Sequence, residues 1–135
     1  MKPTYLLDAN VIVRFLANER TDQFERSKKL MAQAERGECV LILTPWILAE
    51  VIFAATSFYG ADRLTTVGFL RKLIDGNGIV VPERAMVLDA LDRFANKDVD
   101  FADAMLAAQC VAIKVRPASF DRDLDKFADI ERYEP

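Results

Sequence analysis

Histidine is absent from this chain of 135 residues. The absence excludes Ser-His-Asp and Cys-His catalysis, and it also excludes zinc sites that use imidazole ligands. Carboxylate side chains remain available for catalysis, and carboxylates commonly act together with a bound metal ion.

Cysteines and long hydrophobic runs are also scarce. The two cysteines, Cys39 and Cys110, have apolar neighbours, which predicts two buried free thiols. The apolar stretch at 51–55 is interrupted by Glu50 and Thr56, so it is too short to span a membrane. No secretory signal precedes the first strand-like segment. We therefore expect a cytoplasmic protein with no membrane partner.

A strong excess of either charge is missing as well. The net charge is −3 and the isoelectric point is about 5.0, which argues against a general nucleic-acid coat protein. Residues 14–36 nevertheless hold six bases against four acids, which predicts either a local basic face or an ordinary solvated helix face. The apolar content of 52% and charged content of 29% indicate one globular domain over residues 1–135.

Strand-like and helix-like segments alternate along the chain. Strands are predicted at 4–8, 39–43, 79–81 and 117–120, with an edge strand at 130–133. Helices are predicted at 11–18, 22–36, 45–59, 62–75, 83–96 and 101–114, with a final turn or helix at 124–128. This alternation predicts an α/β fold with a parallel sheet. No repeat, low-complexity tract or linker interrupts it.

Four acidic residues stand at the edges of apolar segments: Asp8, Glu50, Asp103 and Asp121. Asp8 and Asp121 each end a predicted strand, and Glu50 is the only charge between residues 41 and 61. An ionised carboxylate in apolar surroundings is unfavourable unless it is paired or holds a metal. The sequence therefore predicts one convergent site for a hard divalent cation.

The sheet pattern places three of these acids at one edge. Ligands of open α/β sheets bind beyond the carboxyl ends of the strands, where Asp8 and Asp121 are expected. Glu50 lies in the helix that leaves the same edge, and no Lys or Arg stands three or four residues away to pair with it. The pattern alone leaves the position of Asp103 open.

Three of the acids also have ordinary structural explanations. Asp8 could cap the helix that begins near residue 11. Asp103 could belong to a capping box with Asp100, since the two are three residues apart. Asp121 and Asp123 could form a solvated turn.

Four segments carry a resemblance to a known family: 5–12, 48–51, 100–108 and 119–123. In order and spacing they resemble the PIN-domain ribonucleases, in particular the VapC-type toxins of prokaryotic toxin–antitoxin pairs. The resemblance extends from end to end of the chain. It implies a three-layer α/β/α sandwich with a central, mostly parallel sheet of four to five strands. Such a fold would bring Asp103 beside the other three acids.

The resemblance also implies roles for individual residues. Asp8 and Asp103 match the principal metal ligands, and Glu50 and Asp121 match the remaining catalytic acids. Asn10 matches a residue that supports the first acid, and Ser119 matches the small hydroxyl position before the last one. Family members often have an aromatic residue soon after the final acidic pair, whereas Phe127 comes later here. This departure leaves open whether Asp121 or Asp123 faces the metal; we prefer Asp121, which directly follows the predicted strand.

The implied activity is Mg²⁺- or Mn²⁺-dependent hydrolysis of RNA phosphodiester bonds, with 3′-hydroxyl and 5′-phosphate products. Substrate contacts are expected from basic residues near the site, with Arg14, Lys28 and Lys29 as candidates by position. The resemblance further implies a cognate antitoxin protein as partner and a homodimer as the usual assembly. Aromatic residues that would line an antitoxin groove, or else pack in the core, are Phe53, Phe58, Tyr59 and Phe69.

Other readings of the acids fit less well. A phospho-acceptor receiver domain has adjacent acids after its first strand, whereas Leu7 and Ala9 flank Asp8. A haloacid-dehalogenase-like phosphatase needs a second Asp where Asn10 stands. A PIN fold kept only for binding, with an idle site, is a third alternative, and the presence of all four acids speaks against it.

Overall fold

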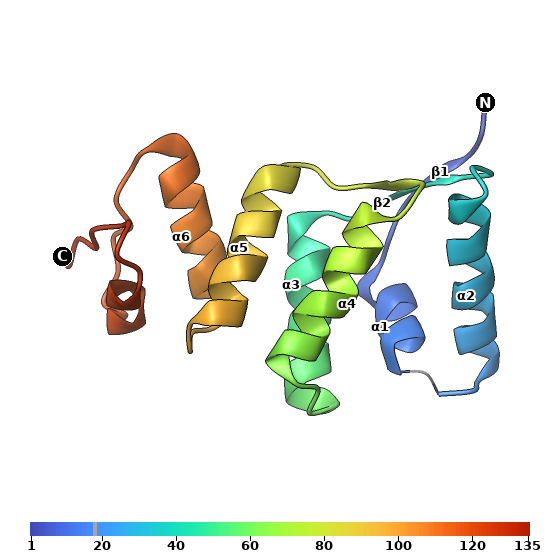
Figure 1. The fold of residues 1–135 in the computed structure, drawn as a ribbon, viewed down its shortest axis with the longest axis horizontal. Helices are drawn as coiled ribbons and strands as arrows, with labels where there is room; N and C mark the ends of the chain where they lie inside the picture. The colour runs from blue at the N-terminus through green and yellow to red at the C-terminus, as the bar shows by residue number, and fades with distance from the viewer. Residues whose placement is uncertain (18) are drawn as a thin grey trace. The chain divides into compact units, whose positions relative to one another are not determined.

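The computed structural model describes residues 1–17 and 19–135 and divides into two compact units, Met1–Pro82 and Glu83–Pro135 (Figure 1). The first unit contains strands β1 to β3 and helices α1 to α4, and the second contains helices α5, α6 and η2. Both units have buried aliphatic and aromatic side chains of their own. The expectation of one domain over residues 1–135 stays a prediction.

The strands of the first unit form a parallel sheet in the order β1-β2-β3. They are β1 (Thr4–Leu6), β2 (Val40–Ile42) and β3 (Ile79–Val80). Beyond their ends, Leu7 N donates to Ile42 O at 2.9 Å and Leu43 N donates to Val80 O at 2.9 Å. Because the strands are parallel, the chain leaves β1 and β2 at the same edge of the sheet.

The helices of the first unit begin where side-chain caps predict. They are α1 (Ala9–Ala17), α2 (Asp22–Glu35), α3 (Pro45–Phe53), the π-helical η1 (Ala54–Phe58) and α4 (Arg63–Asp75). Side-chain oxygens of Thr21, Thr44 and Asp62 accept backbone N–H bonds from the first turns of α2, α3 and α4. Each such cap stabilises its helix by about 1 kcal/mol.

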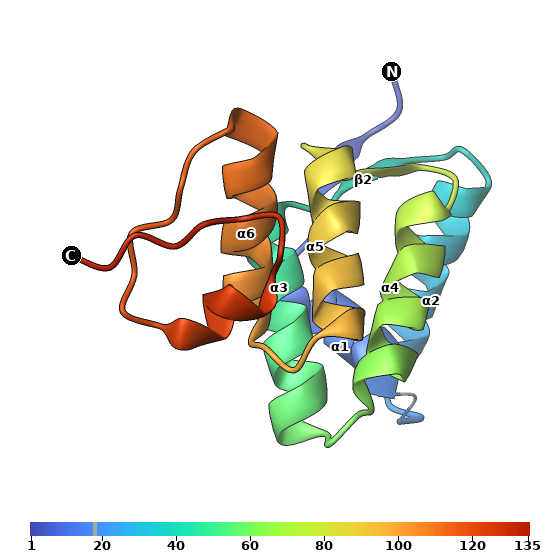
Figure 2. The same cartoon turned by 60° about the vertical axis from the view of Figure 1, so that its left-hand side comes forward.

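Helix packing encloses an aliphatic core in the first unit. Helix α1 packs against α2 and α3, and α4 packs against β3 and η1 (Figures 1 and 2). The Phe15 ring lies 6.2 Å from Phe24 and 5.8 Å from Phe69, measured between ring centroids. Fully buried side chains include Ile12, Leu41, Leu43, Leu48 and Leu70.

The second unit is a helical hairpin followed by a short helix. Helices α5 (Arg84–Asn96) and α6 (Phe101–Ile113) pack against each other, and η2 (Arg122–Lys126) packs against α6 (Figure 2). Phe94 and Phe101 meet edge to face beside the turn that joins the two helices, with ring centroids 5.7 Å apart. Leu124 is fully buried and anchors η2.

The prediction of four to five strands is wrong for the part of the chain that the structure describes, where three strands occur. Residues 117–120 and 130–133 meet only at one isolated parallel bridge. Its two bonds run from Tyr133 N to Pro117 O at 2.8 Å and from Ser119 N to Tyr133 O at 2.9 Å. Pro117 has no N–H to extend the pairing, and the residues after 119 enter the turn into η2. The parallel α/β character is confirmed, whereas the three-layer sandwich stays a prediction.

Most helix predictions hold to within two residues. The helix predicted from residue 11 begins earlier, at Ala9, and its predicted end, Asn18, lies outside the described residues. The helix predicted over 45–59 is confirmed, but its last turn is π-helical. Both cysteines are buried and free, as expected. In residues 1–17 and 19–135, no helix is both long enough and apolar enough to cross a membrane.

Candidate functional site

Asp103 lies in the first turn of α6, beside two buried neighbours, Phe101 and Ala104. The side chain of Asp103 is half-buried, and its Oδ2 atom is fully buried without a hydrogen-bond partner. Asp100 occupies the N-cap position of α6, but its side chain makes no capping bond. The capping-box explanation of these two acids is therefore wrong, and a buried carboxylate oxygen is left without a donor.

Asp121 is positioned by a tight turn that leads into η2. The Asp121 N–H donates to Ser119 Oγ at 2.9 Å, and Asp121 Oδ1 accepts the Asp123 N–H at 2.9 Å. Ser119 is itself fixed by Arg132, whose Nη1 donates to the Ser119 carbonyl at 2.8 Å. The hydroxyl at position 119 thus orients the backbone from which the Asp121 carboxylate projects.

Three carboxylates converge within the second unit. Asp103, Asp121 and Asp123 each place one oxygen so that the three atoms lie within 4.8 Å of one another. Lys126 Nζ lies 3.1 Å from Asp123 Oδ1 and donates to the Asp98 carbonyl at 2.7 Å. One lysine beside three acids leaves the cluster with a net negative charge.

The cluster shifts the protonation of Asp103. Burial, the close contact with Asp121 and the charges of Asp121, Asp100 and Asp123 together raise the pKa of Asp103 from 3.8 to about 6, with burial as the largest cause. Two ionised carboxylates both accept hydrogen bonds, so Asp103 and Asp121 can bond to each other only if one of them holds a proton. With both ionised, the buried Oδ2 of Asp103 needs a cation.

A hard divalent cation fits this donor set. Carboxylate oxygens are the preferred ligands of Mg²⁺ and Mn²⁺. Two unit charges about 4 Å apart repel by roughly 4 kcal/mol at an effective dielectric near 20, and a cation would reverse the sign of that interaction. Two observations support a metal site here: Asp103 Oδ2 is buried without a hydrogen-bond donor, and three carboxylates converge.

Asp8 lies in the first unit, between β1 and α1. It directly follows Leu7, whose N–H makes the last hydrogen bond to the β2 strand, and it directly precedes Ala9, the first residue of α1. The Asp8 carbonyl accepts the Val11 N–H at 3.2 Å, while the side chain is exposed. The predicted position of Asp8 at the carboxyl edge of the sheet is therefore confirmed within this unit.

Glu50 lies on α3, which leaves the same edge of the sheet after β2. Its side chain is exposed, so the apolar segment around Glu50 does not bury it. The helix turns Leu48, Val51 and Ile52 inward and leaves Glu50 outward. Exposed apolar side chains nevertheless flank it, since Trp46 is 74% and Phe53 is 64% exposed.

The other expected site residues gather along α1 and α2. Asn10 is exposed in the first turn of α1, and Arg14 follows one turn later. Both line a groove of about 680 Å³, and Lys29 of α2 lines it as well. Lys28 is exposed on α2 but is not among the lining residues of this groove.

Asp123 belongs to the acid cluster, although the sequence favoured Asp121 alone. The spacing of two residues between them was visible in the sequence, but a predicted strand ending at residue 120 gave no reason to expect both side chains in one turn. The turn into η2 replaces that strand and brings both carboxylates to the cluster.

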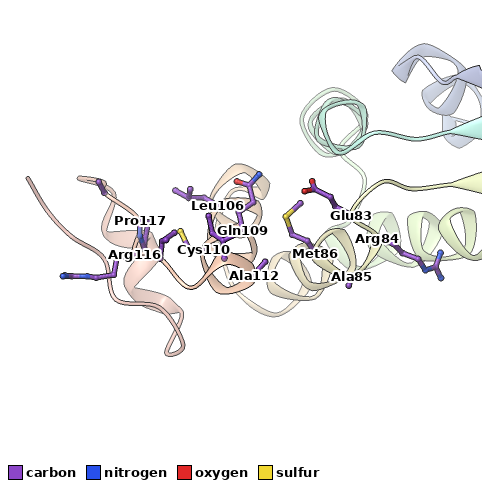
Figure 3. Close-up of a pocket in the computed structure, with 13 residues that line it drawn as sticks. Glu83, Arg84, Ala85, Met86, Leu106, Gln109, Cys110, Ala112, Arg116 and Pro117 are labelled. Carbon is purple, nitrogen blue, oxygen red and sulfur yellow. The ribbon is translucent and has the colours of Figure 1, made fainter.

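A hollow of about 890 Å³ lies elsewhere in the second unit (Figure 3). It is lined mainly by apolar side chains between the start of α5, the end of α6 and residues 115–118. Cys110 lines it, and burial raises the pKa of this thiol. None of the three clustered acids lines this hollow.

Comparison with family models identifies a match over most of the chain. The family model described as PIN domain matches residues 5–130, a span that includes Asp8, Glu50 and the acid cluster. A search of curated proteins found no match to the chain. Because the family model covers nearly the whole sequence, the chain belongs to the PIN domain family.

Proposed function

We propose that this protein is a Mg²⁺- or Mn²⁺-dependent endoribonuclease and the toxin of a VapBC-type toxin–antitoxin pair. PIN domains are generally nucleases and typically use divalent metal ions. The single observation that carries the metal-dependent chemistry is the convergence of Asp103, Asp121 and Asp123 around a buried oxygen that has no donor. The toxin role rests on the resemblance of the four sequence segments to VapC-type proteins.

The proposed metal ligands are all carboxylates. Asp103 and Asp121 would hold the ion, with Asp123 as a further donor of the same cluster. Asp8 and Glu50 would complete the set, as the family resemblance implies. Support for this comes from the first unit, where the parallel strands send the chain into Asp8 and into α3 at one edge of the sheet.

The proposed reaction is in-line attack of water on an RNA phosphodiester, which leaves a 3′-hydroxyl and a 5′-phosphate. A divalent ion supplies stabilisation of the charge that develops on phosphorus and makes water a better nucleophile. The carboxylates must be ionised to bind the ion. The pKa of Asp103, raised to about 6, therefore sets the lower end of the pH range in which the metal-free site is ready to bind it. Asn10 and Ser119 would orient Asp8 and Asp121, and the hydrogen bond from Asp121 N–H to Ser119 Oγ supports the second of these roles.

Positive side chains would hold the RNA. Arg14, Lys28 and Lys29 are the proposed substrate contacts, and Arg14 and Lys29 face a common groove. Phosphate contacts release counterions, so cleavage is expected to slow as the salt concentration rises.

The proposed partners are a cognate antitoxin and a second copy of the chain, acting in the cytoplasm. Phe58 is 82% exposed and Tyr59 is 44% exposed, and Phe53 is exposed beside them on the same helical run. An apolar face of this kind fits an amphipathic partner helix. Phe69 does not belong to it, because its ring is half-buried and packs on Phe15.

The proposal is tested by amide substitution of the acids. Asp8→Asn and Asp103→Asn are each expected to lower the rate of Mg²⁺-dependent RNA cleavage by more than about 100-fold, since changes outside the ligand shell alone cost 10- to 100-fold. Glu25→Gln, an exposed acid on α2, is the charge-matched control and is expected to cleave like the wild type.

Two outcomes would contradict the proposal. Undiminished cleavage by both purified Asn variants would remove these acids from the site. RNA binding without cleavage by the wild type, in either Mg²⁺ or Mn²⁺, would instead favour a PIN fold that is used only for binding.

A further inference from the structure

The groove between α1 and α2 has an unusual lining for a surface hollow of this size. Its volume is about 680 Å³, and its walls carry three cations, Arg14, Arg26 and Lys29. No Asp or Glu is among its lining residues, although α2 contains three acids, Asp22, Glu25 and Glu35. The acids lie outside the groove, so the positive charge of its walls is not neutralised from within.

The helical spacing explains how the sequence builds this groove. Asn10 and Arg14 are four residues apart and therefore share one face of α1. Gln23, Arg26 and Gln33 recur at a helical spacing along the facing side of α2. At 1.5 Å per residue, the wall from Gln23 to Gln33 is about 15 Å long, enough for several nucleotides of an extended strand.

The cations in the groove are available to a ligand. Arg14 and Lys29 make no ion pair within residues 1–17 and 19–135. Arg26 is held only by Asp22 at 3.4 Å, and both side chains of that pair are more than three-quarters exposed. An exposed pair of this type contributes about 0.3–0.5 kcal/mol, so a phosphate can replace Asp22 at little cost.

The remaining lining residues are suited to contacts with the sugar–phosphate backbone of a nucleic acid and not with its bases. Asn10, Gln23 and Gln33 offer amide groups that can donate to phosphate and ribose oxygens, and Ser27 adds a hydroxyl at the floor. No aromatic side chain lines the groove, so there is no platform on which a base could stack. Contacts to phosphate and sugar fix the register of a nucleic acid but do not read its sequence.

We infer that the α1–α2 groove binds the sugar–phosphate backbone of single-stranded RNA, next to the bond that is cut and without regard to base sequence. The groove begins at Asn10, two residues after Asp8, so a strand lying in it leads directly to a proposed metal ligand. The location beside the scissile bond rests on the proposed ribonuclease function. The capacity to bind RNA does not.

The test compares two charge-matched double variants. Arg26→Gln with Lys29→Gln removes two exposed cations of the groove, and Lys2→Gln with Lys72→Gln removes two exposed cations outside it. Binding of short, labelled oligouridylate and oligoadenylate is measured by fluorescence anisotropy in EDTA, so that cleavage does not interfere. Arg14→Gln is measured separately, with its melting temperature, because Arg14 is half-buried.

The groove variant is expected to bind both RNAs about 5- to 10-fold more weakly than the control variant. Its log–log salt slope should fall by about 1.4, since each lost phosphate contact on a single strand contributes about 0.7. In Mg²⁺, the same variant should raise KM and leave kcat within about twofold, because the groove binds substrate and transition state alike.

RNA binding tests the groove inference, and RNA cleavage tests the proposed ribonuclease function. Equal affinity and salt slope for the two double variants would overturn the groove inference even if the wild type cleaves RNA. A loss of affinity confined to one of the two RNAs would overturn its sequence independence. Weaker binding by the groove variant together with a wild type that never cleaves would support the groove and refute the ribonuclease.

Discussion

The two units of the molecule hold their structure in different ways. The first unit contains a parallel sheet whose central strand, β2, pairs with a strand on each side. Leu41 within β2 and Leu43 just after it are fully buried. The second unit has no strand among its described residues beyond one isolated bridge. Its C-terminal segment is held by arginine ion pairs together with the buried side chains of Leu124 and Phe127.

Two arginines form these ion pairs: Arg93 links α5 to the C-terminal segment, and Arg132 forms ion pairs within that segment. Arg93 is only 10% exposed; its Nε lies 3.1 Å from Asp89, and its two terminal nitrogens bind both oxygens of Asp129. The Arg93 guanidinium also lies 5.2 Å from the centre of the Phe127 ring. Arg132 binds both oxygens of Asp125 at 3.0 and 3.1 Å.

This difference matters because Asp121, the N-cap of η2, and Asp123, within η2, are two of the three clustered acids. Asp121 and Asp123 are placed by a segment that Arg132 and Lys126 tie down through Asp125 and the Asp98 carbonyl. Asp8 and Glu50, by contrast, are placed by a strand end and a capped helix. One pair of proposed ligands therefore depends on hydrogen-bonded ion pairs, and the other depends on sheet and helix geometry.

The largest expected effect comes from removing the buried guanidinium. Arg93→Met keeps the volume of the stem but loses both ion pairs, and the free energy of unfolding is expected to fall by about 2 kcal/mol, below the 3–5 kcal/mol of a fully buried pair because Asp89 and Asp129 are partly exposed. Asp129 provides a pH signature: its hydrogen bond to Arg93 lowers the pKa of this carboxyl, so the contribution is present at neutral pH and is lost as pH falls below about 4.

Urea unfolding of Arg93→Met at neutral and acid pH measures this effect. Arg26→Met removes an exposed i,i+4 pair from α2 and is the matched control, with an expected loss of less than about 0.5 kcal/mol. Equal destabilisation by the two variants would show that the two units do not differ in their dependence on ion pairs.

The fold was predictable wherever local chemistry decides it. The helices predicted from residues 22, 45 and 62 begin within one residue of those positions, and Thr21, Thr44 and Asp62 cap them. The prediction of a fourth and a fifth strand was wrong because strand propensity does not specify a pairing partner. Within the described chain, residues 117–120 form only one isolated bridge, to Tyr133. Pairing between distant segments is a property of the whole fold, which local pattern does not encode.

The site was predictable in residue type but only partly in environment. Asp103 and Asp121 lie in one cluster, yet spacing alone could not place them there, and the family resemblance supplied that step. That Asp8 and Glu50 share the site stays a prediction. Glu50 shows the opposite error, because an apolar sequence neighbourhood does not make a residue buried when a helix turns its apolar side inward. Burial depends on helix orientation, which is set by tertiary packing.

An intermediate effect is expected from Asp103→Asn in the absence of metal. The pKa of Asp103 rises from 3.8 to about 6 on folding, so the folded state holds this proton more tightly than the unfolded chain. Below pH 4 the group is protonated in both states and the penalty is absent. As pH rises through about 6 the native carboxyl ionises, and the full penalty is reached.

Asp103→Asn should therefore stabilise the metal-free protein above pH 6 by about 1 kcal/mol, because solvent partly screens the half-buried side chain, and it should have little effect at pH 4. Unfolding in urea with EDTA at both pH values measures this. Adding Mg²⁺ should raise the melting temperature of the wild type and leave that of Asp103→Asn nearly unchanged. A destabilised Asp103→Asn at neutral pH would contradict a strained carboxylate cluster.

The smallest expected effect is that of Glu50→Gln. Glu50 is exposed on α3 and belongs to no carboxylate cluster among the described residues, so its amide variant should change the metal-free unfolding free energy by less than about 0.5 kcal/mol at any pH. In Mg²⁺ the same variant is expected to lose cleavage as Asp8→Asn does. Glu50 would then contribute to the reaction without contributing to stability, whereas Asp103 opposes stability and serves the same reaction. A Glu50→Gln variant that gains as much stability as Asp103→Asn would mean that Glu50 already shares the repulsion of the cluster before any ion arrives.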